Sequence, residues 1–560
     1  MKVSDYLVKK LEDLEIDTVF GYTGGSIADV IDSIGKSANI KFVQSYNEQA
    51  SSFAANAYAQ ITGKTGVAIA SSGPGAINLI NGIANAYYDS IPCVFITGNV
   101  HSCARKCIPQ IRQNAFQETD IIEMVKSVTK FCAYVRNEND IEYILEKAFH
   151  IARSGRKGPV LIDIPYDIQR KDIDVQFLDG YYIQSKELHI DMGKVKSILM
   201  NSRRPLLLLG GGCRDAKCIL KDVLEKVQLP VVVSMRGIDL ISHLDECYIG
   251  LIGTYGSLIA NLAVQYCDLL IVMGSRLAER QMGYDKTQFA PNAKIIQVDI
   301  DQDELGRKTD NTISINTSTE SFFMQFLQQM PIYSCNNWIK FLKKWEKRIS
   351  TELYERHDAF TNSFVRRLSE LFDEDAIISA DVGQNQIICA QSLQMTERND
   401  FLCSAGLACM GYSLPASIGA YFASMNRQII SINGDGGIMM NIQELQTIQR
   451  ENIPIKIIIM NNNCLGLIRK LQENIFDGRY FASISGYSVP DFQKVADAFG
   501  LDYAEIDADN ISACNFWLKN PKPVIIEIKL PTMMSTMFEL EIDEEVDLAL
   551  EDFKKQIGRI

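Results

Sequence analysis

The sequence predicts an α/β fold made of three doubly wound parallel sheets. Short apolar runs of strand length alternate with stretches of helical periodicity along most of the 560 residues. This alternation is typical of parallel sheets with helices on both faces. A polar stretch at 166–191 and a charged helical stretch at 336–348 divide the pattern into three blocks. The length agrees, because a chain of this size corresponds to roughly three or four domains.

Each block contributes four expected strands. They lie at 41–44, 67–70, 93–97, 160–164, then 206–209, 231–234, 269–273, 295–299, and finally 376–379, 428–432, 454–460 and 524–528. We therefore expect domains at 1–165, 190–330 and 360–532. An acidic helical tail at 533–560 follows, and its charge pattern predicts a solvated helix.

Composition excludes several classes of function. Apolar residues make up 47% and charged residues 22%, as in ordinary folded proteins. The net charge of -13 speaks against nucleic acid and against anionic lipid as partners. The longest apolar runs fall well short of the ~18 residues that a membrane span needs. Fourteen cysteines without a C-x-x-C pair predict a cytoplasmic protein with reduced thiols.

A glycine-rich turn follows a strand of the third block. The sequence there is Asn433-Gly-Asp-Gly-Gly437, and Asn461 and Asn462 follow the next expected strand. The apolar residues between them are spaced four, three and three apart, which predicts one crossover helix with a single apolar face, formed by Ile438, Ile442, Leu445 and Ile448. Such a strand–helix–strand unit brings both strand ends to one edge of the sheet.

This edge is expected to bind a metal and a phosphate group. Ligands bind beyond the carboxyl ends of parallel strands, where Asp435 and Asn462 converge. Carboxylate and amide oxygens suit Mg²⁺, which commonly takes further oxygens from a bound phosphate. Glycines let the backbone approach an anion at a helix N-terminus: Gly434, Gly436 and Gly437. The alternative is a sharp turn with a capping aspartate and a chance Asn-Asn pair.

Glu48 stands at the start of a helix, directly after the expected strand at 41–44. The helix has a core-facing stripe formed by Ala50, Phe53, Ala54, Ala57 and Tyr58. The helix dipole alone favours a glutamate at this position. Position therefore does not assign Glu48 a function.

The chain resembles the acetohydroxyacid (acetolactate) synthase family, as a large catalytic subunit or a close paralogue, up to about residue 530. The resemblance is carried by the Gly-Asp-Gly and Asn-Asn elements and by segments of the first block: Glu48-Gln49, Ala57-Tyr58-Ala59, Thr62-Gly63-Lys64, Ser72-Gly-Pro-Gly75, Asn78 and Ile96-Thr97-Gly98. It implies thiamine diphosphate and Mg²⁺ as cofactors. It also implies a pyrimidine-binding domain at 1–165, a central flavin-type domain at 190–330 and a diphosphate-binding domain at 360–532.

The resemblance implies roles for individual residues. Glu48 would activate the cofactor through its aminopyrimidine, with Gly25, Phe116 and Gln117 at the catalytic centre. The metal contacts would be Asp435, Asn462 and Cys464. The remaining cofactor contacts would be Ser72, Asn78, Val382, Gly383, Gln384, Asn385, Ala408, Met410, Gly434, Gly436, Gly437, Leu465, Gly466 and Leu467. The chain departs from the family at Thr23, where proline is usual, and at Asn385, where histidine is usual.

The central domain is expected to bind FAD in a structural role, although many relatives keep this domain without flavin. The contacts that the resemblance implies are Arg156, Gly210, Gly211, Gly212, Ser234, Met235, Gly274, Ser275, Arg276, Arg280 and Asp299. Ala278 and Glu279 replace two residues that are usually acidic. A run of glycines is by itself a weak signal for a dinucleotide.

The implied reaction removes CO₂ from pyruvate or a similar 2-oxo acid and transfers the two-carbon unit to a second carbonyl. Arg276 matches a residue that recognises the acceptor's carboxylate, whereas Leu471 replaces a tryptophan and is expected to open the acceptor pocket. Three hypotheses follow: acetolactate formation, transfer to another acceptor such as a nucleotide-linked ketosugar, and a silent regulatory paralogue. The resemblance further implies a homodimer or homotetramer and a possible small regulatory subunit.

Overall fold

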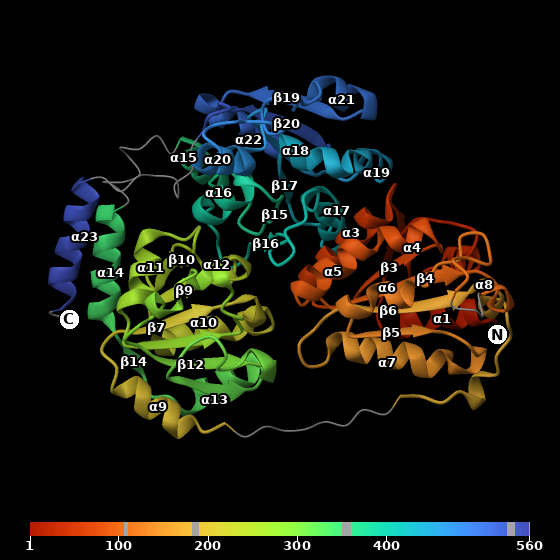
Figure 1. The fold of residues 1–560 in the computed structure, drawn as a ribbon, viewed down its shortest axis with the longest axis horizontal. Coiled ribbons are helices and arrows are strands. Elements are labelled where there is room, and N and C mark those ends of the chain that lie inside the picture. Colours follow the sequence, from red (N-terminus) through yellow and green to blue (C-terminus); the bar gives the residue numbers. More distant parts are fainter. Residues whose placement is uncertain (106–109, 182–189, 350–359, 535–543, 559–560) are drawn as a thin grey trace.

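The computed structural model describes residues 1–105, 110–181, 190–349, 360–534 and 544–558. It has three six-stranded sheets in which every strand pair is parallel. The first sheet lies at the right of Figure 1, the second at the left and the third above both. The predicted class, three parallel-sheet α/β domains, is therefore confirmed. Among the described helices, none combines the length and the apolar character of a membrane span.

The first and third sheets share one topology. The first has, in spatial order, β2 (Lys41–Gln44), β1 (Thr18–Gly21), β3 (Gly66–Ala70), β4 (Cys93–Asn99), β6 (Val160–Pro165) and β5 (Phe131–Tyr134). The third has β16 (Asp400–Leu402), β15 (Ile377–Ala380), β17 (Ile429–Gly434), β18 (Lys456–Asn461), β20 (Val524–Lys529) and β19 (Asp502–Ile506). In the third sheet the strands are added in opposite directions on the two sides of the β15–β17 pair. Such a switch point is where ligands bind in open α/β sheets.

The second sheet has the order of a dinucleotide-binding fold. Its strands are, in spatial order, β10 (Tyr248–Leu251), β9 (Val231–Val233), β7 (Pro205–Leu209), β11 (Leu269–Met273), β12 (Lys294–Asp299) and β13 (Thr312–Asn316). Apart from the short strands β8 (Val227–Gln228) and β14 (Tyr333–Ser334), which pair with each other, this is the order 3-2-1-4-5-6. Its switch point lies between β7 and β11.

Helices cover these sheets. Those of the first are α1 (Val3–Asp13), α2 (Ala28–Lys36), α3 (Glu48–Thr62), α4 (Pro74–Asn78), α5 (Ile80–Tyr88), α6 (Ile121–Val125), α7 (Ile141–Arg153) and α8 (Tyr166–Gln169). Those of the second are α9 (Met192–Met200), α10 (Lys217–Lys226), α11 (Leu258–Tyr266), α12 (Glu279–Met282), α13 (Thr319–Gln329) and α14 (Asn336–Ile349). Those of the third are α15 (Phe360–Ser369), α16 (Gln384–Ser392), α17 (Ser413–Ala423), α18 (Asp435–Ile438), α19 (Leu445–Arg450), α20 (Gly466–Ile475), α21 (Phe492–Phe499) and α22 (Cys514–Leu518), followed by α23 (Glu544–Ile557).

The first and third domains meet where α3 crosses α17. A side chain added at Gly419 of α17 would come within 2.0 Å of the Ala54 carbonyl oxygen of α3. The two helices can approach this closely because α3 is rich in alanine and serine on its buried surface. Phe53 of α3 also packs edge-to-face on Tyr412, which precedes α17. The helix that begins with Glu48 is thus fixed by the third domain of the same chain.

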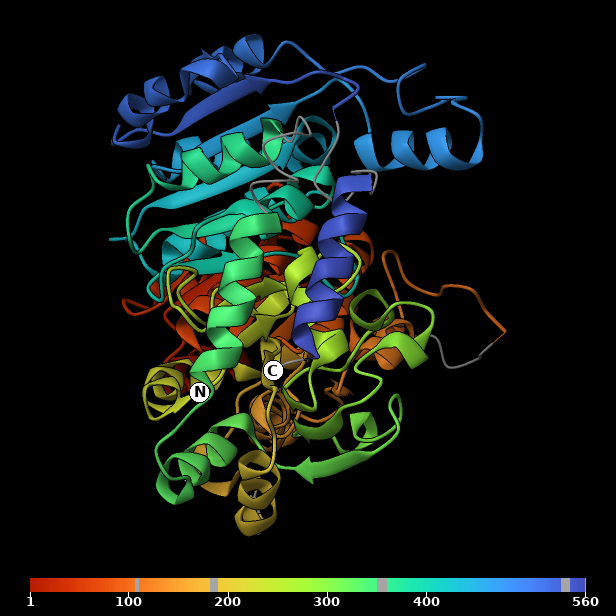
Figure 2. The ribbon, with the colours of Figure 1, turned by 90° about the vertical axis from the view of Figure 1, so that its left-hand side faces the viewer.

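Two expectations about helices were wrong. The single crossover helix predicted after Asp435 is broken into α18, a 3-10 segment at Met439–Glu444 and α19, because Asn441 adopts a non-helical conformation. The C-terminal helix α23 is not a solvated tail. Phe553 is fully buried against Trp345 and Phe341 of α14, and α23 lies beside α14 in both views (Figures 1 and 2).

Candidate active site

Asp435 lies at the carboxyl end of β17, beside the switch point of the third sheet. Its side chain is 2% exposed, and burial raises its pKa above the usual value. The Tyr487 hydroxyl donates a hydrogen bond to Oδ1 at 2.9 Å, whereas Oδ2 is buried without a hydrogen-bond partner. A buried carboxylate oxygen without a partner is costly, so this position is suited to a cation.

Asn462 follows β18, the neighbour of β17 in the sheet, so the two predicted metal ligands come from adjacent strand ends. Its amide nitrogen lies 3.5 Å from Gln384 Oε1, and its Oδ1 accepts the Cys464 amide at 3.3 Å. A side chain at Gly466 would overlap Gln384 Oε1 at 1.8 Å. The structure thus brings Gln384, Asn462 and Gly466 into direct contact, as the sequence predicted for one site.

The Cys464 thiol does not resemble a metal ligand. Its sulfur donates a hydrogen bond to the Thr532 carbonyl at 3.4 Å. Burial raises its pKa to about 11, so the thiol keeps its proton near neutral pH. A thiol that donates its proton to a carbonyl does not present the thiolate that binds metals. In this structure the Cys464 thiol is thus engaged by the Thr532 carbonyl, and its place among the metal contacts stays a prediction.

The glycines of the turn are packed against other predicted residues. A side chain at Gly436 would come within 2.9 Å of Leu465 Cδ2 and 3.6 Å of Met410 Cε. One at Gly434 would come within 3.2 Å of Asn385 Oδ1. Asn385, which replaces the family's histidine, donates to the Asp381 carbonyl at 2.8 Å. Its amide therefore fixes the end of β15 rather than projecting a titratable ring.

Asp381 and Tyr487 belong to this site although neither was among the predicted site residues; Asp381 directly precedes the predicted contacts Val382 and Gly383. Asp381 is fully buried at the end of β15 and accepts the amides of Gly411 at 3.0 Å and Ser413 at 2.9 Å. Burial raises its pKa to about 6. These bonds hold the turn that carries Met410, in which Ala408 has a positive φ of 60°. An acidic residue at a strand end was a usable signal for Asp381, whereas nothing in the sequence links Tyr487 to Asp435.

Glu48 is buried, with 8% exposure, at the first position of α3. Asn78 donates a hydrogen bond to its Oε2 at 2.9 Å, and a side chain at Gly75 would come within 2.9 Å of its Oε1. The predicted partners Glu48 and Asn78 are thus in contact. Both partners belong to the first domain, so in this chain the carboxylate of Glu48 is engaged by α4 of its own domain.

The other predicted residues of the first domain gather around the turn after β3. The Ser72 amide donates to Ser26 Oγ at 2.8 Å. Gln117 has a positive φ of 61°, a strained conformation found mainly at functional sites, and its Cβ would lie 3.1 Å from a side chain at Gly73. Phe116 is 86% exposed, and no atom lies within 4 Å of a side chain added at Gly25.

A cavity of about 970 Å³ lies between the three domains. Ten of the eleven residues predicted to contact FAD line it: Arg156, Gly211, Gly212, Ser234, Met235, Gly274, Ser275, Arg276, Arg280 and Asp299. Gly210 is the exception. A side chain there would lie 2.2 Å from the Gly274 carbonyl oxygen, so Gly210 serves the close packing of its turn against the turn at Gly274. Four of the predicted cofactor contacts in the third domain also line the cavity: Val382, Gly383, Ala408 and Leu467.

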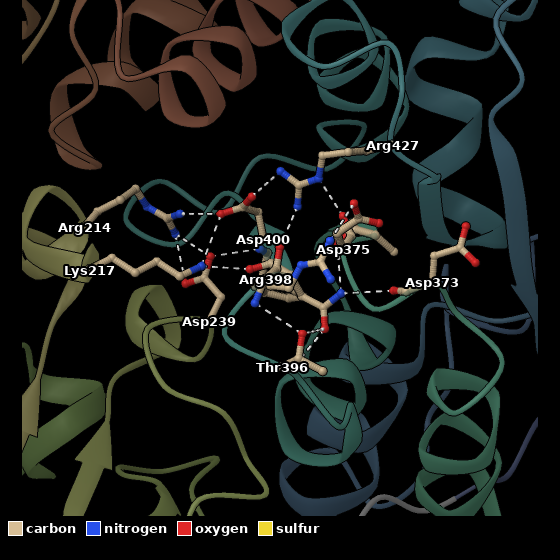
Figure 3. A network of polar contacts seen from close by, with 12 residues as sticks. Arg214, Lys217, Asp239, Asp373, Asp375, Thr396, Arg398, Asp400 and Arg427 are labelled. Atoms are coloured by element: carbon tan, nitrogen blue, oxygen red, sulfur yellow. Dashed lines mark hydrogen bonds and ion pairs between the residues drawn. The ribbon is translucent and has the colours of Figure 1, made fainter. Parts of the chain in front are cut away.

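The basic groups of this cavity differ in what they bind. Arg156 pairs with Asp301 at 3.1 Å and with Glu304 at 3.0 Å. Arg214 and Lys217 belong to an ion-pair network that joins the second domain to the third through Asp400 and Arg427 (Figure 3). Arg280 stacks over Tyr255 at 5.5 Å. Asp299 ends β12 and has a pKa raised by burial.

The two residues predicted to recognise the acceptor substrate lie in different surroundings. Arg276 is half-buried and lines the cavity, with its backbone carbonyl accepting from Lys308. Leu471 is 45% exposed on α20. Other apolar side chains are exposed on this helix and the segment after it, namely Ile468, Ile475, Phe476 and Phe481. The chain on its own therefore leaves an apolar surface beside Leu465 and Gly466 uncovered.

Comparison with known proteins identifies the three domains. Residues 1–124 match the N-terminal thiamine pyrophosphate-binding domain of thiamine pyrophosphate enzymes, 192–329 match their central domain and 381–528 match their C-terminal thiamine pyrophosphate-binding domain. Each matched segment contains most of the strands of one sheet, whereas β5 and β6 of the first sheet and β15 of the third lie beyond the matched residues.

Individual relatives agree over nearly the full chain. The chain is 34% identical to the large subunit of acetolactate synthase isozyme 2 of Escherichia coli, over 95% of this chain and 96% of that subunit. It is 36% identical to the acetolactate synthase large subunit of Parasynechococcus marenigrum, over 92% and 85% respectively. It is 34% identical to the chloroplastic acetolactate synthase 1 of Nicotiana tabacum, over 95% and 82%. The chain therefore belongs to the acetolactate synthase family and is a thiamine diphosphate-dependent enzyme of the lyase/transferase kind.

Proposed function

We propose that this enzyme decarboxylates pyruvate, or a similar 2-oxo acid, and transfers the two-carbon unit to a second carbonyl, as the names of its relatives indicate. The observation that carries the proposal is the buried, unpartnered Oδ2 of Asp435 beside Asn462 at the switch point of the third sheet. A buried carboxylate oxygen without a donor calls for a cation.

Asp435 and Asn462 are the proposed protein ligands of Mg²⁺. Their oxygens are the hard donors that this ion prefers, and its remaining ligands commonly come from phosphate and water. The carbonyl oxygen of Cys464, rather than its thiol, remains available as a further donor. Thiamine diphosphate, when bound, supplies an electron sink for the carbanion that loss of CO₂ leaves behind.

Glu48 is the proposed acid–base residue. Its part is to hold and exchange a proton at a ring nitrogen of the cofactor's aminopyrimidine, and Asn78 orients it by donating to Oε2. Removal of a positioned acid–base group typically lowers a rate by ~10²–10⁴-fold. Glu48→Gln keeps the size of the side chain and the bond from Asn78, so it is the matched change for this role.

We propose that the active enzyme is at least a homodimer in which Glu48 of one chain faces the Asp435 site of another. Two observations favour this. Within the described residues, Glu48 Oε2 accepts from Asn78 and its Oε1 lies close to Gly75, both in its own domain, and Phe116, also predicted at the catalytic centre, is 86% exposed. The apolar side chains of α20 are exposed beside the Asp435 site. Light scattering during size-exclusion chromatography tests this, and a monomer with full activity would refute it. A small regulatory subunit is a further proposed partner, because relatives are named as large subunits.

We propose FAD as the occupant of the 970 Å³ cavity, in a structural role. The strand order of the second sheet, the close turns at Gly210 and Gly274 and the acidic end of β12 are features of dinucleotide-binding folds. Carboligation transfers no net electrons, so the flavin would not need to change its oxidation state. A flavin absorption band that remains with the protein after gel filtration supports this assignment, and a purified protein without flavin that is fully active would refute it.

The acceptor distinguishes two forms of the proposed reaction. Arg276 favours an acceptor with a carboxylate, which leads to acetolactate when the acceptor is a second pyruvate. Leu471 favours a larger acceptor such as a nucleotide-linked ketosugar, because the exposed leucine leaves more space than a tryptophan would. Purified protein is incubated with pyruvate, thiamine diphosphate and Mg²⁺. Formation of acetolactate at a rate that matches the release of CO₂ supports the first form. Release of CO₂ with little acetolactate supports the second.

Glu48→Gln is the control for the reaction itself. It is expected to lower CO₂ release by at least about 10²-fold while the protein keeps its melting temperature. A Glu48→Gln variant as active as the wild type would show that Glu48 is not the acid–base residue. A wild-type protein with no activity on pyruvate or other 2-oxo acids would favour a silent paralogue.

A further inference from the structure

A carboxylate from the third domain holds the turn that precedes Glu48. Glu444 ends the 3-10 segment after Asp435, and its side chain is fully buried. Its Oε1 accepts the backbone amides of Tyr46 at 2.9 Å and Asn47 at 3.1 Å. Its Oε2 accepts the hydroxyl of Thr447 at 2.7 Å. Both carboxylate oxygens are therefore engaged, one by each of two domains.

The amides that Glu444 accepts lie between two elements. Tyr46 and Asn47 follow β2 and precede α3, so their N–H groups belong neither to the β2 ladder nor to the helix. Asn47 is the N-cap of α3, and its side chain accepts the Gln49 amide at 2.8 Å. Buried backbone amides require partners. Glu444 supplies these partners, so its position sets the position of the turn and of Glu48, the next residue.

Further contacts from the same segment enclose the turn. Asn441 donates to the Gly411 carbonyl at 2.8 Å and reaches Gln49 Oε1 at 3.4 Å. Arg450 donates to the carbonyl of Gln44. Gly411 lies in the turn that carries Met410. The segment after Asp435 thus connects the end of β2, the start of α3 and the Met410 turn within one chain.

We propose that Glu444 is a positioning residue for the acid–base step. It touches neither substrate nor cofactor, but it fixes the backbone on which Glu48 stands and ties it to the segment that begins with Asp435. The inference rests on the proposed function of Glu48. A displacement of about 1 Å at a reacting group can lower a rate by ~10²-fold, so a loosened turn is expected to slow proton transfer without removing the carboxylate of Glu48.

The charge of Glu444 adds a pH dependence to this role. Burial raises its pKa to about 7, against the opposing effect of Thr447 and the two amides. Arg450 is the charged group that acts on it. Ionised oxygens accept N–H bonds more strongly than neutral ones. Activity is therefore expected to fall as the pH drops through about 7 and Glu444 takes up a proton.

The effect on stability has the opposite sign. An acid whose folded pKa is raised keeps its proton in the folded protein after the unfolded chain has lost it. The contribution of Glu444 to the free energy of unfolding is thus largest below pH 4.5, the ordinary pKa of a glutamate. It is lost as the pH rises to about 7, the pKa of Glu444 in the folded protein. If Glu444 served stability alone, activity would not rise with pH over the range in which its contribution to the free energy of unfolding falls.

Three variants separate these roles. Glu444→Ala removes the acceptor, and Glu444→Gln keeps an acceptor oxygen of the same shape without the titration. Glu451→Gln is the control for loss of a carboxylate on the same segment, because Glu451 pairs with Lys41 of β2 at 2.9 Å and with Arg450 at 3.1 Å but does not reach the turn. The measurements are amide hydrogen exchange at residues 45–49, exchange of the thiazolium C2 proton of bound thiamine diphosphate, and kcat against pH.

Glu444→Ala is expected to expose the Tyr46 and Asn47 amides to exchange and to slow C2-proton exchange and kcat by about 10²-fold. Glu444→Gln is expected to stay within a few-fold of wild type at high pH and to lose the acid limb near pH 7. Glu451→Gln is expected to behave as wild type. The proposal is overturned if Glu444→Ala only lowers the melting temperature while C2 exchange and the pH profile stay unchanged. The same conclusion follows if Glu444→Gln retains the acid limb.

These outcomes remain distinct from failure of the proposed function. If the wild-type protein releases no CO₂ from any 2-oxo acid, the proposed reaction is wrong. Amide exchange at residues 45–49 is measured without cofactor, so it still reports whether Glu444 fixes the turn. Glu48→Gln is expected to lose C2 exchange while its turn keeps wild-type amide protection. Equal protection of the turn in Glu444→Ala and wild type would overturn the inference whatever the reaction is.

Discussion

Three buried acidic side chains of the first and third domains have both carboxylate oxygens occupied by neutral hydrogen-bond donors. Asp381 accepts two backbone amides, Glu444 accepts two amides and a hydroxyl, and Asp163 accepts Thr97 and Asn99. Burial raises the pKa of all three, to about 6, 7 and 7 respectively. Asp435 differs, because one of its oxygens has no donor. The oxygen without a donor marks Asp435 as the candidate cation ligand among these buried acids.

At this scale we predict that Asp435→Asn abolishes the stabilisation that Mg²⁺ and thiamine diphosphate give together. A ligand present at 100 times its Kd stabilises the folded state by about 2.7 kcal/mol. Wild-type protein should therefore melt at a higher temperature with both cofactors than with EDTA, and Asp435→Asn should melt at one temperature in both conditions. Differential scanning fluorimetry measures this. Asp477→Asn, at an exposed position, is the control, and an undiminished shift in Asp435→Asn would contradict the metal assignment.

At the scale of the element, small side chains decide how closely α3 and α17 approach. Gly419→Ala would place a methyl group 2.0 Å from the Ala54 carbonyl, which neither backbone can accommodate without moving. Overpacking of this kind costs about 1–3 kcal/mol. We expect urea denaturation to show this loss and activity to fall, because α3 begins with Glu48. Gly35→Ala is the control, since no atom lies within 4 Å of its added methyl group and its stability should be unchanged or increased.

The C-terminal helix α23 allows a second prediction at this scale. Phe553 is fully buried against α14, and Arg348 pairs with Asp552 at 2.8 Å. Loss of a buried phenylalanine costs about 3–5 kcal/mol, and Phe553 is the largest buried side chain of α23. Phe553→Ala should therefore detach α23 while the three sheets keep their stability. Limited proteolysis should cleave it near the C-terminus, and Leu548→Ala, at a position 64% exposed, should resist like wild type. Equal resistance in both variants would contradict this.

At the scale of the whole molecule, ion pairs join the second and third domains beside the cavity. Asp400 lies 2.7 Å from Arg427, 3.5 Å from Lys217 and 3.6 Å from Arg214 (Figure 3). Arg214 also pairs with Asp239. This aspartate is fully buried, and its carboxylate accepts a hydrogen bond from a backbone amide. A single carboxylate thus stands among three cations from two domains. This arrangement couples the walls of the cavity to the third sheet.

We predict that Asp400→Asn uncouples the unfolding of these two domains. Removing one partner of a buried ion pair costs about 3–5 kcal/mol, and this partly buried group is expected to lose less, because solvent screens it and Arg214 keeps Asp239 as a partner. Calorimetry should resolve two transitions where the wild type shows one, and a ligand in the cavity should bind more weakly. Arg398→Ala, whose side chain is 60% exposed, removes a neighbouring ion pair as the control. A single unshifted transition in Asp400→Asn would show that the domains are coupled by other contacts.

The sequence alone determined the inner framework of the molecule. Four strands of each sheet were predictable, in most cases because strands buried on both faces form continuous apolar runs; the edge strand β2, with one buried residue, is the exception. Five of the six missed strands of the three large sheets lie at an edge, where strands such as β5 and β13 are only half-buried and their apolar pattern is weaker. The positions of Asp435, Asn462 and the cavity-lining arginines followed from strand ends and from resemblance.

Only the tertiary structure decided which residues meet. Tyr487 reaches Asp435, and Glu444 reaches the turn at Tyr46 and Asn47, across sequence separations that no local pattern records. Asn441 breaks the expected crossover helix, which is what directs Glu444 toward the first domain. The physical reason is general. Periodicity and strand ends are local properties of the chain, whereas hydrogen-bond partners of buried polar groups are set by the packing of one domain on another.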